Sequence, residues 1–219
     1  MTRVLNSASR PARSGRTKSV VVFVHGYGAD GADLLGLADP MAPHLPDTAF
    51  YAPDAPDRCT GNPFGYQWFP IPWLDGSSEA AAAEGLAASA DDLNDYLDVV
   101  MAAEGVGPDR LALVGFSQGS MMSLHVAPRR PLPVAGVVAF SGRLLVPDRL
   151  AADAVSKPPV LLLHGDADPV VPFADVGKAG DALVAAGFET YAHVMRGTGH
   201  GIAPDGLSTA LGFLHARLT

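Results

Sequence analysis

A serine flanked by glycines is the residue whose setting most directly suggests covalent chemistry. Ser117 stands at the centre of the string GFSQG at residues 115–119, a G-x-S-x-G pattern that follows an apolar run and precedes a segment typical of a helix. Such a strand-to-helix turn holds the serine in a strained conformation with its hydroxyl exposed, and the glycines remove side chains that would clash. The pattern predicts a nucleophilic serine; the alternative is a small-residue turn that only allows close packing.

A carboxylate and an imidazole that could activate this serine follow later in the chain. Asp166 and Asp168 come just after another apolar run, and a carboxylate there could orient an imidazole and stabilise its cation. Spacing alone does not choose between the two aspartates, which could also cap the turn through local hydrogen bonds. His200 stands in the string GTGHG at residues 197–201, so we expect a loop that lets its ring swing into a site.

The string GYGADG at residues 26–31 supports a rival interpretation. It is a G-x-G-x-x-G after an apolar run, and Asp54 follows about 20 residues later, as in dinucleotide-binding loops. A dinucleotide-binding oxidoreductase is therefore one alternative, and a non-catalytic binding protein of the same fold is another. The oxidoreductase interpretation gives no role to Ser117, Asp168 or His200. A protein that only binds a ligand has no need of a nucleophile, an acid and a base together. In a hydrolase the same glycines would let backbone N–H groups approach a substrate carbonyl oxygen.

The other histidines and the single cysteine predict no metal site. Six histidines lie in or beside expected strands or helices, with no metal-ligand spacing among them: His25, His44, His125, His164, His193 and His215. Cys59 lies in an irregular segment and is expected to be a surface or half-buried thiol rather than a nucleophile. We therefore predict neither a metal nor a cofactor.

Short apolar runs alternate with longer alanine- and leucine-rich segments, which predicts an α/β fold. Several runs are apolar at nearly every position, as in parallel strands that are covered on both faces. The expected strands are residues 19–25, 48–52, 110–115, 134–140, 159–164 and 189–195, and the expected helices are 30–45, 78–104, 117–127, 173–186 and 204–218. This alternation predicts a three-layer, doubly wound, mostly parallel sheet. Its ligands would bind beyond the carboxyl ends of the strands, where the residues named above lie.

Residues 53–77 show neither the hydrophobic period of a helix nor that of a strand, and they combine five prolines with several aromatic side chains. A long loop of this kind in a compact domain is typically a lid or a binding wall, and the alternative is a loop that only covers the core.

The composition excludes several classes of protein. Hydrophobic residues make up 48% of the 219 residues, too many for a disordered chain, and no stretch reaches the roughly 18 apolar residues of a membrane-spanning helix. The net charge is −8, but residues 1–18 hold five basic residues and no acid, so residues 19–219 carry −13. An acidic body repels phosphate backbones, so no nucleic-acid partner is expected.

The charge distribution and length also predict the organisation of the chain. We expect residues 1–18 to form a flexible basic arm, because serine, proline and arginine offer little to pack. Residues 19–219 are short enough for one domain. One cysteine and no apolar run of signal-peptide type at the start predict a cytoplasmic protein without stable membrane insertion.

The order Ser117, Asp168, His200 is that of the α/β-hydrolases. Beyond that superfamily, the chain resembles the bacterial phospholipase/carboxylesterase family, close to the acyl-protein thioesterases. The resemblance covers nearly everything from about residue 19 to the end. The matching strings are VVFVHGYGADG at 21–31, GFSQGS at 115–120, FSG at 140–142, HGDADPVVP at 164–172 and GHGI at 199–202.

The resemblance implies an α/β-hydrolase fold and a serine carboxylesterase that forms an acyl-enzyme. The family pattern H-G-x-x-D implies Asp168 as the acid, and the family's oxyanion hole would use the backbone N–H groups of Tyr27 and Gln118. At 219 residues there is no room for a separate cap domain, so we expect a shallow groove for short-to-medium acyl esters or thioesters. Its expected apolar walls are Trp68, Phe69, Leu144 and Val171, and a homodimer is a further expectation by analogy.

Overall fold

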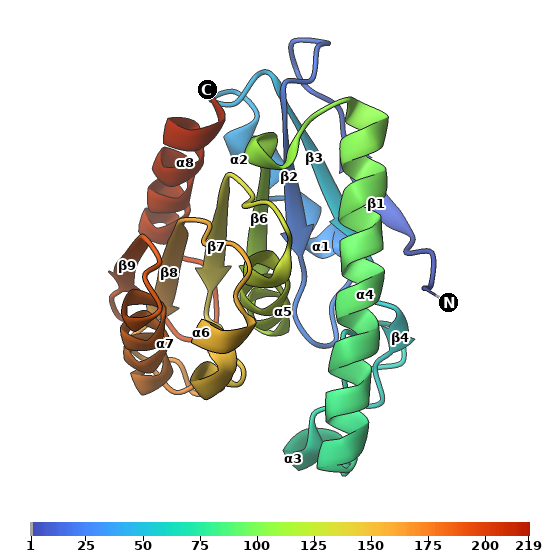
Figure 1. Cartoon of the computed structure of the whole chain (residues 1–219), viewed down its shortest axis with the longest axis vertical. Helices are drawn as coiled ribbons and strands as arrows, with labels where there is room; N and C mark the ends of the chain where they lie inside the picture. The colour runs from blue at the N-terminus through green and yellow to red at the C-terminus, as the bar shows by residue number, and fades with distance from the viewer. Residues whose placement is uncertain (1) are drawn as a thin grey trace.

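The computed structural model describes residues 2–219 and has a seven-stranded sheet at its centre (Figure 1). Neighbouring strands pair in parallel except at one edge, where β1 runs antiparallel to β3. In sheet order the strands are β1 (Ser7–Arg10), β3 (Thr48–Pro53), β2 (Ser19–Val24), β6 (Leu111–Phe116), β7 (Gly136–Phe140), β8 (Val160–Gly165) and β9 (Thr190–Met195). The predicted mostly parallel, doubly wound sheet is confirmed.

Helices cover both faces of this sheet. One core cluster joins the sheet to α4 (Glu79–Glu104), α5 (Gln118–Val126) and α7 (Ala174–Ala185), and a second joins its other face to α1 (Gly31–Leu35), α2 (Ala38–Met41) and α8 (Pro204–Leu218). Within β2, Val20, Val22 and Val24 belong to the first cluster, whereas Val21 and Phe23 belong to the second. Burial on both faces is the physical reason why the central strands are apolar at every position.

The helices that the structure describes are mostly those expected from the sequence. They are α1 (Gly31–Leu35), α2 (Ala38–Met41), α3 (Pro72–Asp75), α4 (Glu79–Glu104), α5 (Gln118–Val126), α6 (Leu150–Asp153), α7 (Ala174–Ala185) and α8 (Pro204–Leu218), with short 3-10 turns at Pro108–Arg110, Ala127–Arg129 and Pro147–Arg149. Helix α4 begins after Ser78, whose side chain accepts a hydrogen bond from the Ala81 N–H, and ends at Gly105 in the left-handed conformation.

Two expectations about local structure are wrong. The helix expected over residues 30–45 is two short helices, α1 and α2, separated at Gly36 and Leu37. Residues 53–77 are not wholly irregular, because they contain a small hairpin of β4 (Asp57–Arg58) and β5 (Tyr66–Gln67) as well as α3. Residues 2–219 show no separate cap domain, as expected.

From residue 2 on, the segment expected to be a flexible basic arm contains a strand and buried side chains. Its residues 7–10 form the edge strand β1, and the side chains of Leu5 and Ala12 are buried. Arg3 forms an ion pair with the buried Asp92, at 2.8 Å. The sequence did not indicate this strand because an edge strand is held by backbone hydrogen bonds along one side and needs no apolar alternation.

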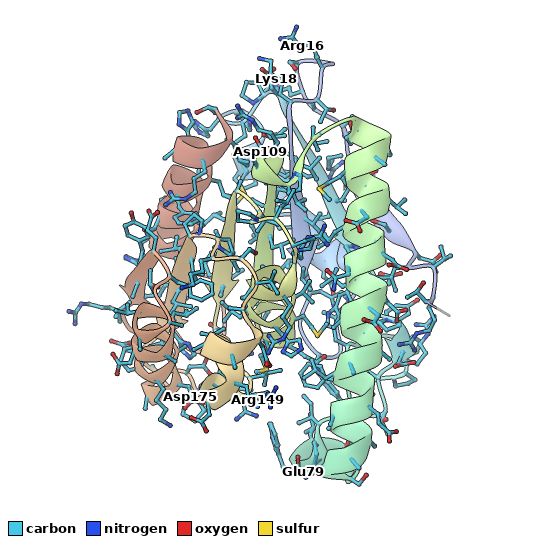
Figure 2. The ribbon with its side chains drawn as sticks, viewed as in Figure 1. Arg16, Lys18, Glu79, Asp109, Arg149 and Asp175 are labelled. Carbon is cyan, nitrogen blue, oxygen red and sulfur yellow. The ribbon has the colours of Figure 1, made fainter. Side chains whose placement is uncertain are left out.

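The carboxyl ends of the parallel strands all face one end of the molecule. Lys18 and Asp109, which precede β2 and β6, lie at the opposite end of the molecule from Glu79, Arg149 and Asp175 (Figure 2). The chain order reverses between β2 and β6, so the sheet has a switch point there, where doubly wound folds place their ligand sites.

Candidate active site

Ser117 occupies a strained turn between β6 and α5. Its φ and ψ angles are 54° and −116°, a region that side chains with a Cβ rarely adopt, and its N–H donates to the Phe140 carbonyl at 2.9 Å. A Cβ added at Gly115 would lie 2.5 Å from the backbone of Gly119, and one at Gly119 would lie 1.8 Å from the Val24 carbonyl oxygen. Both glycines are therefore required by close backbone packing, as in a nucleophile elbow.

His200 connects Ser117 with Asp168. Its Nε2 lies 3.0 Å from the serine Oγ, and its Nδ1 lies 2.7 Å from Oδ2 of Asp168. The carboxylate can only accept a hydrogen bond, so Nδ1 donates and Nε2 is left as an acceptor for the serine proton. The three residues follow β6, β8 and β9, and the His200 ring packs against Phe116 with 5.0 Å between ring centroids. The structure thus brings together the three residues that the sequence singled out.

The side chain of Asp168 is fully buried and completely hydrogen-bonded. Its Oδ1 accepts from the backbone N–H groups of Val170 and Val171 at 2.8 and 3.0 Å. Burial by itself would raise the pKa of Asp168, but hydrogen bonds from His200 and these two amides outweigh it and hold the pKa below its ordinary value. Asp166 instead accepts from the Gly197 N–H at 2.6 Å, so the geometry selects Asp168 as the partner of the imidazole.

Two backbone N–H groups beside Ser117 are free to bind a substrate oxygen. A Cβ built on Gly26 would lie 3.2 Å from the Ser117 Cβ, so the loop that carries Tyr27 packs directly on the serine. Within residues 2–219, neither the Tyr27 N–H nor the Gln118 N–H donates to a protein acceptor. Gln118 is also the first residue of α5, so its amide points outward at the positive end of a helix. This placement fits the expected pair of oxyanion donors.

Backbone N–H groups of the loop at residues 26–31 are already hydrogen-bonded to neighbouring segments, which does not suit dinucleotide binding. The Gly28 N–H donates to the Tyr66 carbonyl at 2.9 Å, and the Gly31 N–H donates to Asp54 at 2.9 Å. A dinucleotide loop presents its amides at the start of a long helix and keeps the later carboxylate for a ribose. Here those groups are occupied, and α1 has only five residues.

An apolar groove of about 220 Å³ lies near Ser117 in the fold, because Met121, one turn after Ser117 on α5, lies in its wall together with Phe69. Other lining residues come from α3, the first turns of α4 and the loop after β7; among them are Ile71, Trp73, Leu86, Arg143 and Leu145. The Arg143 guanidinium lies 5.0 Å from the centre of the exposed Trp73 ring, across the groove.

The four residues expected to line this groove have different positions. Phe69 lines it, as expected, whereas Leu144 lines an adjoining hollow of about 280 Å³. Trp68 has no exposed surface and packs in the core, so its assignment as a wall is wrong. Val171 is also buried and contacts the site through its backbone, which bonds to Asp168. A run of aromatic residues in a sequence does not show which of the side chains are buried in the core and which line a groove.

A buried hydrogen-bonded group near the site includes His25, to which no role in the site was assigned from the sequence. His25 bonds to Gly26 through Nδ1 at 2.7 Å and accepts from the Ala55 N–H through Nε2 at 2.9 Å. The side chains of Trp68 and Gln118 form further buried hydrogen bonds around it. Cys59 is buried rather than half-exposed. Only the position of His25 directly before the glycine loop could have pointed to this group.

Within residues 2–219, no three histidine, cysteine, aspartate or glutamate side chains lie together in a group that could hold a metal ion. The helices in this range lack the length and apolar character needed to span a membrane.

Comparisons with known proteins identify the family of the chain. Residues 9–218 match the family model described as Phospholipase/Carboxylesterase. Esterase YpfH of Escherichia coli is 28% identical over 99% of this chain and 87% of its own, and acyl-protein thioesterase 1 of Eremothecium gossypii is 31% identical over 94% and 91%.

Solved structures show the same fold. The crystal structure of esterase PE8 has a TM-score of 0.93 and 44% identity and covers 99% of this chain and 100% of its own. That of Zea mays acyl-protein thioesterase 2 has a TM-score of 0.78 and 27% identity, with coverage of 98% and 99%. The chain therefore belongs to the phospholipase/carboxylesterase family of the α/β-hydrolase fold and is a carboxylic ester hydrolase.

Proposed function

We propose that this protein is a serine carboxylesterase that cleaves short-to-medium acyl esters or thioesters through an acyl-enzyme on Ser117. The observation that carries the proposal is the position of His200 between Ser117 and Asp168, with contacts of 3.0 and 2.7 Å. Nucleophile, base and orienting carboxylate within hydrogen-bond reach of one another are the arrangement that acyl transfer requires.

In the proposed acylation step, His200 Nε2 takes the proton of the serine hydroxyl as Oγ forms a bond to the substrate carbonyl carbon. The carbonyl oxygen becomes an oxyanion, which the N–H groups of Tyr27 and Gln118 stabilise. The ester or thioester bond then breaks, and the imidazolium gives its proton to the leaving alcohol or thiol. Asp168, whose pKa is held low, remains a carboxylate and stabilises the imidazolium throughout.

Deacylation repeats these steps with water. His200 removes a proton from a water molecule, which attacks the acyl-enzyme carbonyl, and the same two N–H groups hold the second oxyanion. The carboxylic acid leaves and the serine recovers its proton. Each backbone donor would contribute about 10²–10³ in rate.

The groove supports the assignment of short-to-medium acyl groups. Its lining is mainly apolar, and its volume of about 220 Å³ is below the roughly 300–1,000 Å³ of pockets that enclose a drug-sized ligand. We propose that the acyl chain lies against Phe69, Ile71 and Met121, which line this groove. A series of 4-nitrophenyl esters from acetate to palmitate tests this assignment, because kcat/KM should peak among the shorter chains and fall for palmitate.

Ser117→Ala tests the central assignment. The variant should fold normally, lose about 10⁶ in kcat and no longer react with a fluorophosphonate that labels active serines. Ser208→Ala, on the exposed side of α8, is the matched control and should retain both. Near-normal turnover by Ser117→Ala would exclude Ser117 as the nucleophile. The expected homodimer, cytoplasmic location and lack of a nucleic-acid partner stay predictions.

A further inference from the structure

Trp68 joins the two segments that carry the free N–H groups of the site. It has no exposed surface. Its backbone N–H donates to the side-chain Oε1 of Gln118 at 2.9 Å, and its indole Nε1–H donates to the His25 carbonyl at 3.0 Å. One residue, distant in sequence from both, therefore bonds to the start of α5 and to the end of β2.

The contact with Gln118 holds the residue that supplies one oxyanion donor. The side-chain amide of Gln118 is buried and uses both of its ends, since Oε1 accepts from Trp68 and Nε2 donates to the Phe69 carbonyl at 2.8 Å. Two parallel hydrogen bonds restrict rotation of the amide plane. A residue fixed at both its backbone and its side chain has little freedom to move its N–H away from the reacting carbonyl.

The contact with His25 holds the other donor. His25 directly precedes the glycine loop and bonds to the Gly26 carbonyl through Nδ1, one peptide before Tyr27. Because Nε2 accepts from the Ala55 N–H, Nδ1 carries the proton. Burial lowers the pKa of His25, which keeps the ring neutral and this donor–acceptor pattern intact. The indole of Trp68 packs 5.6 Å from the imidazole and bonds to the carbonyl of the same residue.

A hydrogen bond from helix α4 also holds Trp68 in place. Its carbonyl accepts a hydrogen bond from the Ser89 hydroxyl on α4, a residue that is fully buried. All the polar atoms of Trp68 thus have partners on three elements, so it cannot shift without breaking buried hydrogen bonds, each of which is costly to leave unmade.

We propose that Trp68 is a positioning residue that sets the separation of the two oxyanion-binding N–H groups, those of Tyr27 and Gln118. The inference rests on the function proposed above. It replaces the substrate-wall role expected for this residue from the sequence. The physical reason is that oxyanion stabilisation depends on donors held at the correct distance before the reaction, with no reorganisation in the transition state.

Trp68→Phe tests the proposal because it keeps an aromatic ring but deletes the bond to the His25 carbonyl. Complete loss of one oxyanion donor costs about 10²–10³ in kcat, so a displaced donor should cost about 10- to 100-fold. With 4-nitrophenyl butyrate, kcat per titrated active site should fall by this factor while KM changes by less than about threefold. The affinity for a trifluoromethyl ketone, which forms an oxyanion adduct with the serine, should weaken by a similar factor.

Tyr51→Phe is the matched control. It removes another hydrogen bond of an aromatic side chain, that from the Tyr51 hydroxyl to Glu104, outside the catalytic machinery, and should leave kcat unchanged. A second variant, Gln118→Met, keeps a side chain of similar length but deletes both amide hydrogen bonds, and it decides the question if Trp68→Phe does not fold. The losses of the two variants should be less than additive in the double variant, because both release the same arrangement.

The outcomes separate this inference from the proposed function. If Trp68→Phe and Gln118→Met retain kcat within about twofold of the wild type, or lose activity only through KM, Trp68 does not position the donors. Unchanged ketone affinity alongside a lowered kcat also overturns the inference. By contrast, failure of the wild type to hydrolyse any ester, or full activity of Ser117→Ala, contradicts the proposed function itself.

Discussion

Replacing Asp168 by asparagine should trap His200 in the wrong tautomer. In the wild type, Oδ1 accepts from the N–H groups of Val170 and Val171, and Oδ2 accepts from His200 Nδ1. Asparagine has only one acceptor oxygen. If that oxygen stays on the two backbone amides, the NH₂ group faces Nδ1, which must then accept a hydrogen bond instead of donating one.

The opposite orientation of the amide is unfavourable. It would place the NH₂ group against the two N–H donors and leave them without an acceptor in a buried site, at about 1–3 kcal/mol each. The first orientation is therefore the more stable one. The ring proton of His200 then moves to Nε2, where it points at Ser117. A histidine in this form cannot take the serine proton, and the expected loss in kcat is about 10⁴. That factor corresponds to about 5.5 kcal/mol of transition-state stabilisation.

The assay is kcat for 4-nitrophenyl butyrate near neutral pH, with thermal unfolding as a check on folding. Asp166→Asn is the matched control, because its carbonyl oxygen can still accept from the Gly197 N–H, which Asp166 Oδ1 does at 2.6 Å. Its kcat should stay within about threefold of the wild type, as for a surface change of small effect. Turnover of Asp168→Asn above about a tenth of the wild type, or a larger loss in Asp166→Asn, would exclude Asp168 as the residue that sets the tautomer of His200.

Two further predictions concern pH and packing. The kcat/KM of the wild type should fall on acidification, because only a neutral imidazole can take the serine proton. The lowered pKa of Asp168 keeps its carboxylate ionised as the pH falls, so a pH profile of kcat/KM that does not fall in acid would contradict a histidine base. Gly119→Ala should fail to fold or lose more than about 5 °C in Tm, because its Cβ would lie 1.8 Å from the Val24 carbonyl oxygen. In the control Gly212→Ala on α8, the added Cβ meets nothing within 4 Å, so the free energy of unfolding should rise by up to about 1 kcal/mol and Tm by up to about 4 °C. Equal Tm changes in the two variants would show that the close backbone contact at Gly119 does not limit stability.

Local patterns in the sequence were sufficient to predict the central strands, helix α4 and two residues of the candidate site. The core strands are recognisable because burial on both faces of a parallel sheet demands apolar residues throughout. Helix α4 is recognisable because its ends carry a serine cap and a glycine stop. Ser117 could be predicted because the turn that presents it needs its glycine neighbours, and His200 because it lies in a glycine-rich string after the last expected strand.

Other features depend on contacts between segments that are far apart in the chain. The edge strand β1 could not be predicted because its hydrogen bonds to β3 carry no signature in its own residues. The exposure of neighbouring aromatic residues is likewise decided by the surrounding fold, which buries Trp68 and leaves Trp73 on the surface. By contrast, the helix expected over residues 30–45 is divided for a local reason that the prediction overlooked, because Gly36 lies at the break and Pro40 and Pro43 disfavour one continuous helix.

Residue types that are neighbours in the chain predicted the sheet, Ser117 as a candidate nucleophile and His200 as its candidate partner. Contacts in the folded chain were needed to select Asp168 as the aspartate that meets the imidazole, and to find that Trp68 bonds to both segments that carry the free N–H groups. Directed contacts of this kind depend on distances across the sheet, which no local spacing encodes.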